Sequence, residues 1–369
     1  MGNIEIRHLK LIKAIEDVGS LKEAAKLLFL TPSALSHQLK ELENRLNTQL
    51  FYRKNNRLIF TPSGKELKEA SKDIINRLDQ VDVAIKELIT DNSKKYIHGY
   101  STEESLRLVN QAESISDVLH YDSIWEEGSL VLEAGCGVGA QTKSIAALNP
   151  SCKFIAIDIA LSSLKSAQEM CNQHHLKNIV FKQADIFSLP FKEGHFDHIF
   201  VCFLLEHLSK PKDALKELHR VLKPGGTITV IEGDHGSTFF HPDSMEARKT
   251  IDAQVRLHHK KGGNAYIGRQ LYPLLSSCNF SGITISPRQV YVDDSKPELL
   301  ESFIKNTFTA MIKGISEESI AQGIIDKRSF EKGIRDLYRT AEGGGTFSYT
   351  FFKAKGIKVA KEMPIKALS

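Results

Sequence analysis

Residues 133–139, Glu-Ala-Gly-Cys-Gly-Val-Gly, constrain the fold of this 369-residue chain more than any other segment. They follow an apolar run, 129–132, that is typical of a buried strand, and they precede a helical pattern that opens at Gln141 and Thr142. Glycine allows backbone dihedrals and close approaches to a ligand that other residues resist. A strand, a glycine turn and a helix in this order indicate an open α/β sheet that binds a nucleotide-like cofactor.

The acid before the glycines narrows the choice of cofactor. The dinucleotide fingerprint G-x-G-x-x-G sets its third glycine beside a pyrophosphate, whereas here Glu133 precedes glycines at alternate positions. A carboxylate at this place would repel a pyrophosphate but attract an amino group. The pattern therefore predicts S-adenosylmethionine (SAM), which carries an ammonium and a sulfonium group.

Polar residues end the next predicted strands as well. A strand over 153–157 ends at Asp158, whose carboxylate can accept hydrogen bonds from both ribose hydroxyls. A strand over 180–184 ends at Asp185, placed for the adenine amino group. A fourth strand over 196–202 and a Lys-Pro-Gly-Gly turn before a fifth, 227–232, complete the order. The alternative, that the acids only cap helices, is disfavoured because the pattern repeats strand after strand.

Residues 97–358 resemble the class I SAM-dependent methyltransferases, in the branch related to ubiquinone biosynthesis. The lead-in at 98–122 and the loop at 133–142 are similar to a subgroup that acts on small molecules. The resemblance implies an α/β fold with a seven-stranded Rossmann-like sheet and a helical cover. Tyr100 is spaced to line the cofactor pocket with Arg107 and Gln111. The expected cofactor-binding set is Tyr100, Glu133, Gly135, Gly137, Gly139, Asp158, Ile159, Asp185, Ile186 and Cys202.

Methyl transfer from a sulfonium mainly requires that the acceptor be positioned, and it needs a base only if the acceptor must lose a proton. The ends of the fourth and fifth strands should face the acceptor. His207 is the first candidate for a base, although it could instead only order the loop or the cofactor. Glu206, Asp234 and His235 are expected to bind the substrate. Asp234, His235 and His241 could alternatively form a metal site, but their spacing is not a known ligand pattern, so no metal is expected.

The chain after the fifth strand predicts the rest of the sheet and its cover. Strands are expected over 282–292 and 346–353, with a mostly helical segment, 296–342, between them. We interpret that segment as a cover over the acceptor site. Four of its apolar side chains can line an acceptor pocket or equally belong to plain core: Phe303, Phe308, Met311 and Tyr338.

The first ninety residues predict a different domain. An amphipathic helix over 9–18 ends at Gly19, and Ser20 can cap a second helix with Glu23 at the capping-box position. Pro32 suits the first position of a third helix, with Thr31 as its cap. Two short helices joined by a tight turn indicate a helix-turn-helix, and residues 50–61 predict a β-hairpin wing with a basic tip.

This segment resembles the winged helix-turn-helix domain of LysR-type regulators, and residues 33–38 are similar to those of LysR regulators of methionine biosynthesis. Asn47 stands where the family usually has glycine, and asparagine tolerates the left-handed cap conformation. Residues 1–65 hold eleven Lys or Arg against six Asp or Glu, a surplus of five, whereas the whole chain has +4. The resemblance implies that Ser33, Ser36, His37 and Lys40 contact DNA and that Arg53, Lys54 and Arg57 contact its phosphates.

A long helix is expected from residue 63 to residue 89, with an apolar seam that includes Leu67, Ile74, Ile75 and Leu78. In LysR-type proteins this linker helix pairs two subunits, so a homodimer that reads two half-sites is expected. The alternative is that the helix packs on the methyltransferase domain of its own chain.

The expected domains are a DNA-binding head (1–62), a linker helix (63–92), a methyltransferase (93–358) and a tail (359–369). No two-lobed effector domain follows the head. We expect a regulator that binds double-stranded DNA and methylates a small molecule; alternatively, the methyltransferase fold only senses SAM or a related metabolite. A DNA methyltransferase is disfavoured because residues 202–207 lack the Asn/Asp-Pro-Pro-aromatic motif of amino-methylating DNA enzymes. Without a signal sequence or a long apolar span, a cytoplasmic protein is expected.

Overall fold

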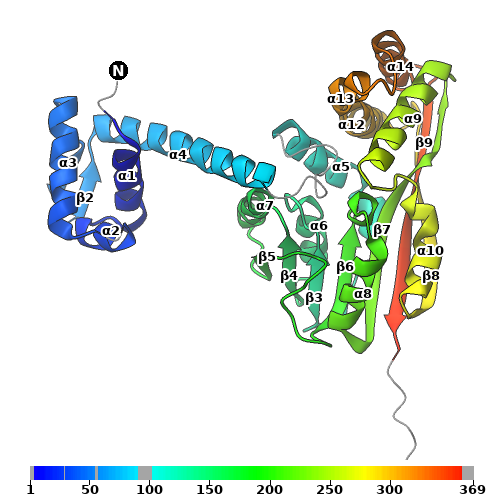
Figure 1. Cartoon of the computed structure of the whole chain (residues 1–369), viewed down its shortest axis with the longest axis horizontal. Coiled ribbons are helices and arrows are strands. Elements are labelled where there is room, and N and C mark those ends of the chain that lie inside the picture. Colours follow the sequence, from blue (N-terminus) through cyan, green and yellow to red (C-terminus); the bar gives the residue numbers. More distant parts are fainter. Residues whose placement is uncertain (1–3, 29, 55–56, 90–101, 360–369) are drawn as a thin grey trace, which may run out of the picture. The chain divides into compact units, whose positions relative to one another are not determined.

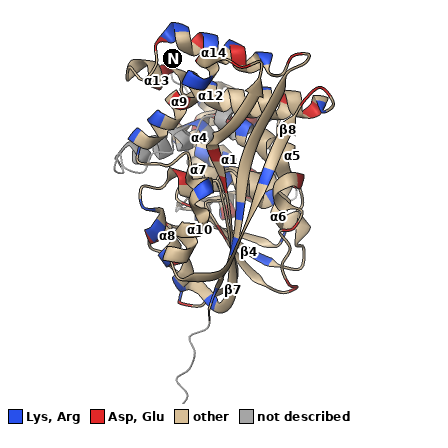
Figure 2. Ribbon diagram, turned by 90° about the vertical axis from the view of Figure 1, so that its right-hand side faces the viewer, with Lys and Arg blue, Asp and Glu red and all other residues tan. Residues whose placement is uncertain are grey.

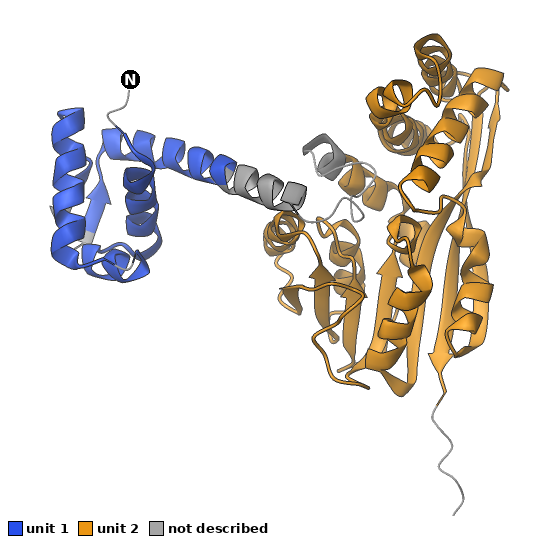
Figure 3. Cartoon of the chain, viewed as in Figure 1, with its two compact units in different colours: residues 1–91 blue, residues 92–369 orange. Residues whose placement is uncertain are grey.

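The computed structural model describes residues 4–28, 30–54, 57–89 and 102–359. The chain divides into two compact units, residues 1–91 and 92–369 (Figure 3). In the first unit, a three-helix head is followed by a two-stranded hairpin and a long helix (Figure 1). Its elements are α1 (Ile6–Val18), α2 (Leu21–Leu27), α3 (Pro32–Leu46), β1 (Phe51–Lys54), β2 (Arg57–Phe60) and α4 (Pro62–Ile89).

The predicted caps of the head are confirmed. The Ser20 side chain accepts a hydrogen bond from the backbone N–H of Glu23, and Thr31 accepts one from Ala34. Asn47 ends α3 in the left-handed region with φ 48°. These local signals set where the helices begin and end, and the strands β1 and β2 pair antiparallel as the expected wing.

The seam expected along α4 is divided between two roles. Leu67 and Ile75 are buried in the core of the first unit, together with Leu35, Leu39 and Leu42 of α3. Ile74 and Leu78 lie on another side of α4 and are 46% and 39% exposed. Leu67 and Ile75, which we expected in the seam that pairs two subunits, are therefore part of the core of the head itself.

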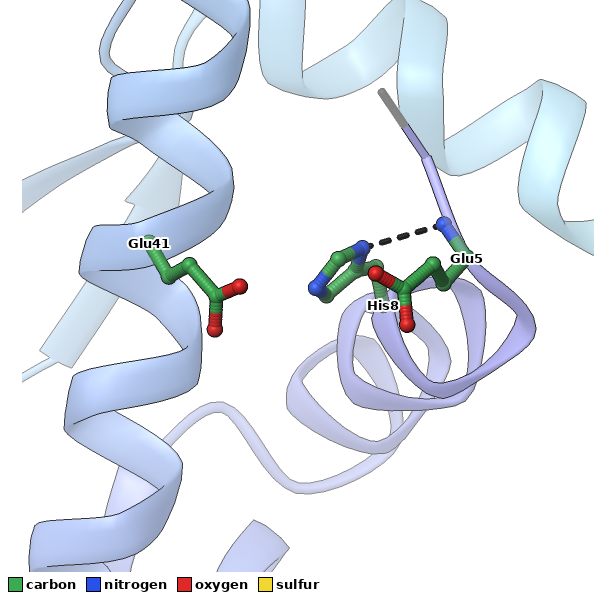
Figure 4. A group of neighbouring side chains, drawn as sticks. All are labelled: Glu5, His8 and Glu41. Carbon is green, nitrogen blue, oxygen red and sulfur yellow. Dashed lines mark hydrogen bonds between the residues drawn. The ribbon is translucent and has the colours of Figure 1, made fainter. Parts of the chain in front are cut away.

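Glu5, His8 and Glu41 gather where α1 meets α3 (Figure 4). They are the one group of potential metal ligands that converges within the described residues. Arg45, however, lies 2.7 Å from Glu5 Oε1 and also pairs with Glu41, and His8 Nδ1 accepts from the Glu5 backbone N–H at 3.0 Å. Because arginine already neutralises both carboxylates, the group joins α1 to α3 as an ion-pair network.

The second unit is built on a seven-stranded sheet in the order β5-β4-β3-β6-β7-β9-β8, which confirms the predicted fold. Strands β3 to β7 run parallel to one another, and β9 pairs antiparallel with both β7 and β8. The bounds are β3 (Leu130–Ala134), β4 (Lys153–Asp158), β5 (Ile179–Gln183), β6 (Phe196–Cys202), β7 (Leu222–His241), β8 (Phe280–Val292) and β9 (Thr346–Lys358).

Strand β7 is longer than the expected 227–232. It begins at Leu222, before the predicted Lys-Pro-Gly-Gly turn, and it continues to His241 because β9 offers it a long antiparallel partner. The register shifts between Asp234 and Phe239. Gly233, Asp234 and residues 239–241 are thereby paired with β9.

Helices cover both faces of the sheet (Figure 2). Most Lys, Arg, Asp and Glu residues lie on loops and on helices, for example on α8 and α14. No helix in the described ranges is both long and apolar enough to cross a bilayer. The larger helices are α5 (Thr102–His120), α6 (Ala140–Leu148), α7 (Leu161–Gln173), α8 (Pro211–Val221), α9 (Met245–Lys260), α10 (Leu271–Ser277) and α14 (Lys327–Arg339). The shorter helices are η2 (Leu205–His207), η3 (Ile267–Gln270), α11 (Pro297–Leu299), the π-helix η4 (Leu300–Thr309), α12 (Ala310–Gly314) and α13 (Ser316–Ala321).

The strand order creates a switch point between β3 and β6. The chain winds outward from β3 to β5 and then returns to place β6 on the other side of β3. In open α/β sheets, ligands bind outside the carboxyl ends of the strands at such a point. Both the glycine loop after β3 and the segment after β6 begin there.

Candidate active site

The three glycines of the loop after β3 have different roles. Gly135, Gly137 and Gly139 all have positive φ values, of 76°, 53° and 83°. A Cβ atom on Gly135 would lie 2.8 Å from the Leu204 side chain, and one on Gly139 would lie 2.8 Å from the Cα of Ala167. A Cβ on Gly137 would meet no atom within 4 Å. Two glycines therefore permit close packing, and the middle one faces open space.

Glu133, in β3 directly before this loop, is only 2% exposed. Its Oε2 atom has no hydrogen-bond partner among the described residues. Burial, with a smaller effect of the Asp158 charge, raises the pKa of Glu133 to about 8. A buried carboxyl oxygen without a partner is costly, and a cationic donor would relieve that cost.

Asp158, the last residue of β4, and Asp185, two residues after β5, both lie at the carboxyl ends of the parallel strands. Asp158 accepts hydrogen bonds from the backbone N–H groups of Gly137 and Ala160, both at 2.9 Å. Burial raises the pKa of Asp158 despite these bonds. Each carboxylate oxygen has a second lone pair for another donor. Asp185 likewise accepts from the Phe187 N–H at 3.0 Å.

The remaining cofactor candidates are distributed around this edge. Ile186 and Cys202 are buried, Cys202 as the last residue of β6, and Ile159 is exposed. Arg107 donates to Gln111 at 3.0 Å on α5. Tyr100 lies outside the described residues. The roles of these residues in binding a cofactor stay predictions.

A cavity adjoins the glycine loop. Leu204 packs against Gly135, and the residues on either side of Leu204 in the sequence lead into the cavity wall. Three of the four apolar residues proposed from the sequence line it, whereas Tyr338 packs against the core. The lining residues are Arg107, Leu108, Gln111, Phe203, Glu206, His207, Gly233, His235, Phe303, Thr307, Phe308, Met311, Tyr349 and Phe351.

Glu206 lies between two histidines in this wall and is 8% exposed. Its carboxylate oxygens are 3.6 Å from His207 Nε2 and 3.8 Å from His235 Nε2. Burial alone would raise the pKa of Glu206, but the neighbouring histidines, His207 first, outweigh burial and hold that pKa below its ordinary value. Glu206 is therefore an ionised carboxylate in a largely aromatic wall.

A second buried acid supports the turn that carries Glu206. Glu232 Oε1 accepts from the backbone N–H groups of Leu204 and Leu205, at 3.0 and 2.7 Å. Burial, and then the charge of Glu206, raise the pKa of Glu232 well above its ordinary value. Glu232 thus supports the turn that carries Glu206 from a fully buried position.

Asp234 is held by partners that the sequence did not reveal. Its two carboxylate oxygens accept from Nε and an Nη of Arg269, both at 2.8 Å, and Asp234 does not line the cavity. Its predicted contact with a substrate is untested, and its ion pair with Arg269 ties β7 to η3 just before the register shift in β7. Tyr349 and Phe351 of β9 also line the cavity, although the sequence analysis did not predict them. Their place depends on the long-range pairing of β9 with β7.

In the first unit, the predicted DNA-contacting residues of α3 lie on one accessible side. Ser33, His37 and Lys40 are exposed, and Ser36 is partly exposed. Arg53 and Lys54 lie in β1 and Arg57 in β2, but their side chains are outside the described part of the chain. A helix that presents polar side chains next to a hairpin suits insertion into a major groove.

Two family models match the chain. Residues 6–65 match the model described as bacterial regulatory helix-turn-helix protein, lysR family, and residues 132–230 match the model described as methyltransferase domain. The chain therefore combines a LysR-family helix-turn-helix domain with a methyltransferase domain, as the sequence predicted.

Some curated relatives match one of the two domains, and another matches most of the chain. The HTH-type transcriptional regulator MetR of Escherichia coli is 44% identical over 21% of this chain and 24% of its own length. The demethylmenaquinone methyltransferase of Lactococcus lactis is 32% identical over 32% of this chain and 48% of its own. An uncharacterized 37.1 kDa protein in transposon TN4556 of Streptomyces fradiae is 28% identical over 80% of this chain and 84% of its own. Among solved structures, YcgJ of Bacillus subtilis matches 70% of this chain and all of its own, with 15% identity and a TM-score of 0.43.

Proposed function

We propose that this chain, which joins a LysR-family helix-turn-helix domain to a methyltransferase domain, binds double-stranded DNA as a transcription regulator and transfers a methyl group from SAM to a small molecule. The observation that carries the enzymatic half is the edge at the β3/β6 switch point. Among the described residues, Glu133 Oε2 has no hydrogen-bond partner there and no atom lies within 4 Å of a Cβ built on Gly137, and an aromatic cavity adjoins the loop.

These residues fit SAM chemically. The buried Glu133 carboxyl suits the ammonium of the methionine part, and Asp158 has lone pairs left for the ribose hydroxyls. Asp185 and Ile186 would bind the adenine. When bound, SAM supplies an electrophilic methyl group on a sulfonium. The chain then has to orient the acceptor and exclude water, which suits a buried cavity with aromatic walls.

The affinity for SAM is expected to fall as the pH drops below 8. Glu133 has a pKa raised to about 8 by burial, and it must ionise to pair with the ammonium. Below that pH Glu133 of the free protein is protonated, and SAM binding must release this proton. The affinity for SAM should therefore fall by up to about tenfold per pH unit. Calorimetric titrations between pH 6 and pH 8 measure this slope. In Glu133→Gln, affinity should be low and nearly independent of pH; an unchanged slope would contradict this role.

Methyl transfer is tested with SAM that carries a radiolabelled methyl group. The purified full chain is incubated with a fractionated extract of small molecules and, separately, with duplex DNA. Label in a small-molecule fraction supports the proposal, whereas label in DNA alone overturns it. An Asp158→Ala variant serves as the blank.

DNA binding is expected to depend on the wing. Lys or Arg that contact phosphates release counterions, so the double variant Arg53→Ala, Lys54→Ala should lower the slope of log affinity against log salt by about 1.8. Affinity should fall alike for specific and unrelated duplexes, as measured by fluorescence anisotropy. Lys313→Ala, a basic residue of the other unit, is the matched control. An unchanged slope in the double variant would refute the assignment of the wing.

Two further features belong to the proposal. Ile74 and Leu78, exposed on α4, are available for a homodimer that pairs through residues 63–89. A protein that regulates transcription in this way acts in the cytoplasm.

One observation favours the alternative, in which the methyltransferase fold senses SAM or a related metabolite. Helix α5 begins at Thr102, shortly after the first unit ends, and contributes Arg107 and Gln111 to the cavity wall. A ligand in the cavity would therefore contact the first described helix that follows the linker in the sequence. If SAM changes DNA affinity while no label is transferred, the sensor function is supported.

A further inference from the structure

We propose that His235 accepts a proton from the methyl acceptor, that Glu206 positions His235 for this step, and that the acceptor is a hydroxyl on an aromatic or alkyl body. This inference rests on the proposed methyl transfer and adds to it the acceptor class and the proton-accepting atom. His235 differs from His207, the base candidate that the sequence suggested first.

The two nitrogens of His235 face different surroundings. Nε2 lies 3.8 Å from the carboxylate of Glu206, while Nδ1 is buried and has no hydrogen-bond partner in the described structure. The residue is 5% exposed and lines the cavity. A neighbouring carboxylate favours the tautomer with its proton on Nε2. Nδ1 is then left with a lone pair and no protein donor, which suits a donor group on a ligand.

The backbone fixes this pair. The N–H of His235 donates to the Ala265 carbonyl at 3.0 Å, and the N–H of Asn264 donates to the Glu206 carbonyl at 2.8 Å. Thr238 donates its hydroxyl to the His235 carbonyl at 2.9 Å. One turn, at residues 264–265, thus holds both members in place. A base that is positioned in advance loses little freedom when the acceptor binds.

Glu206 is the carboxylate that faces His235. Glu232 already accepts from two backbone N–H groups, and burial lowers the pKa of His258 to about 3, so His258 is neutral. Asp234 is already paired with Arg269. Of the remaining titratable groups in the wall, Arg107 contacts Gln111, His207 faces Glu206, and burial raises the pKa of Tyr349 well above its ordinary value. Glu206 therefore supplies the negative charge that an imidazolium at His235 requires.

The walls indicate the acceptor class. The rings of Phe308 and Tyr349 lie 6.4 and 5.6 Å from the His235 ring, centroid to centroid. Such walls favour an aromatic or alkyl body. A neutral amine attacks through its free lone pair, but a hydroxyl must lose its proton to become a good nucleophile. A preformed histidine–carboxylate pair therefore matches a hydroxyl acceptor.

The step balances as follows. The acceptor oxygen forms a bond to the methyl carbon while the carbon–sulfur bond breaks, and the electron pair of that bond stays on sulfur as a neutral thioether. The hydroxyl proton moves to Nδ1 of His235, and the imidazolium is neutralised by Glu206. Release of that proton to solvent restores the site.

The test uses 4-nitrophenol as a probe, without any methyl donor, because its phenolate absorbs visible light. At a pH below the midpoint of the free probe, the full chain should convert bound probe to phenolate. In His235→Gln the fraction of bound probe present as phenolate should be about tenfold lower than in the wild type. In the matched control His259→Gln, at an exposed histidine, this fraction should be unchanged. In Glu206→Gln the conversion should need a higher pH, because the imidazolium loses its counter-charge; a merely structural role would not move this profile.

Three outcomes would overturn the proposal: no phenolate on the wild-type chain, full conversion in His235→Gln, or loss in His207→Gln with retention in His235→Gln. Imidazole added to His235→Ala should restore methyl transfer to a phenol, and lack of rescue beside intact SAM binding also counts against it. SAM binding is measured separately by calorimetry. If the wild-type chain does not bind SAM, the proposed function fails, whereas the probe result still decides the chemistry of His235.

Discussion

Asp158→Ala is expected to lower SAM affinity by about 100-fold or more. Two hydrogen bonds from ribose hydroxyls to a charged acceptor are together worth about 3–6 kcal/mol. The same substitution removes the acceptor of the Gly137 and Ala160 N–H groups, which shape the loop. The effect therefore combines a lost contact with a loosened cradle. Calorimetric titration of the full chain with SAM measures it.

Asp158→Asn separates these two contributions. Its amide oxygen can still accept from one loop N–H, but it lacks the charge and half of the acceptor capacity. We expect an intermediate loss of affinity, with a thermal unfolding midpoint close to that of the wild type. If Asp158→Ala bound SAM within about threefold of the wild-type affinity, less than 1 kcal/mol would be lost and the predicted ribose contact would be wrong.

Asp122→Ala is expected to destabilise the second unit by about 3 kcal/mol or more, because it leaves a buried ammonium without its counter-charge. Lys353 is 1% exposed, and its Nζ lies 2.5 Å from Asp122 and 3.0 Å from the Leu119 carbonyl. Arg288 also donates to Asp122, at 2.7 Å. Burial alone would raise the pKa of Asp122, but Lys353 outweighs it and lowers that pKa to about 2.

The contacts of Asp122 with Arg288 and Lys353 join the end of α5 to β8 and β9. Their loss should loosen the packing of α5 on the sheet. Trp125 is the single tryptophan of the chain and lies in the second unit, where its fluorescence follows urea unfolding. Lys355→Met is the matched control: Lys355 also faces Asp122, at 3.5 Å, but is 44% exposed, so it should cost less than about 1 kcal/mol. Equal effects of the two variants would show that burial of Lys353 does not set the cost.

Much of the fold could be predicted because its signals are local. Ser20 and Thr31 cap helices through residues three positions away, and Asn47 marks a helix end by its own conformation. The glycine loop is likewise readable from a strand, an acid and three glycines in sequence. The same locality made Asp158 and Asp185 recognisable, since one ends β4 and the other lies two residues after β5.

The rest depends on contacts between distant segments. Asp234 is paired with Arg269 across 35 residues of sequence, a contact that no spacing reveals, and its predicted role as a substrate ligand stays a prediction. Leu67 and Ile75 fitted a dimer seam, yet the head buries them, because one helical face can serve a core as well as a partner. The aromatic wall from Tyr349 and Phe351 arises from the pairing of β9 with β7, which sequence patterns do not encode.

A crystal structure of the full chain with S-adenosylhomocysteine tests the central claim most directly. The account predicts the nucleoside at the β3/β6 switch point, with both ribose hydroxyls on Asp158, the amino group at Glu133 and the sulfur directed toward the cavity that His235 lines. A nucleoside bound elsewhere, or an unoccupied loop at saturating ligand, would contradict it.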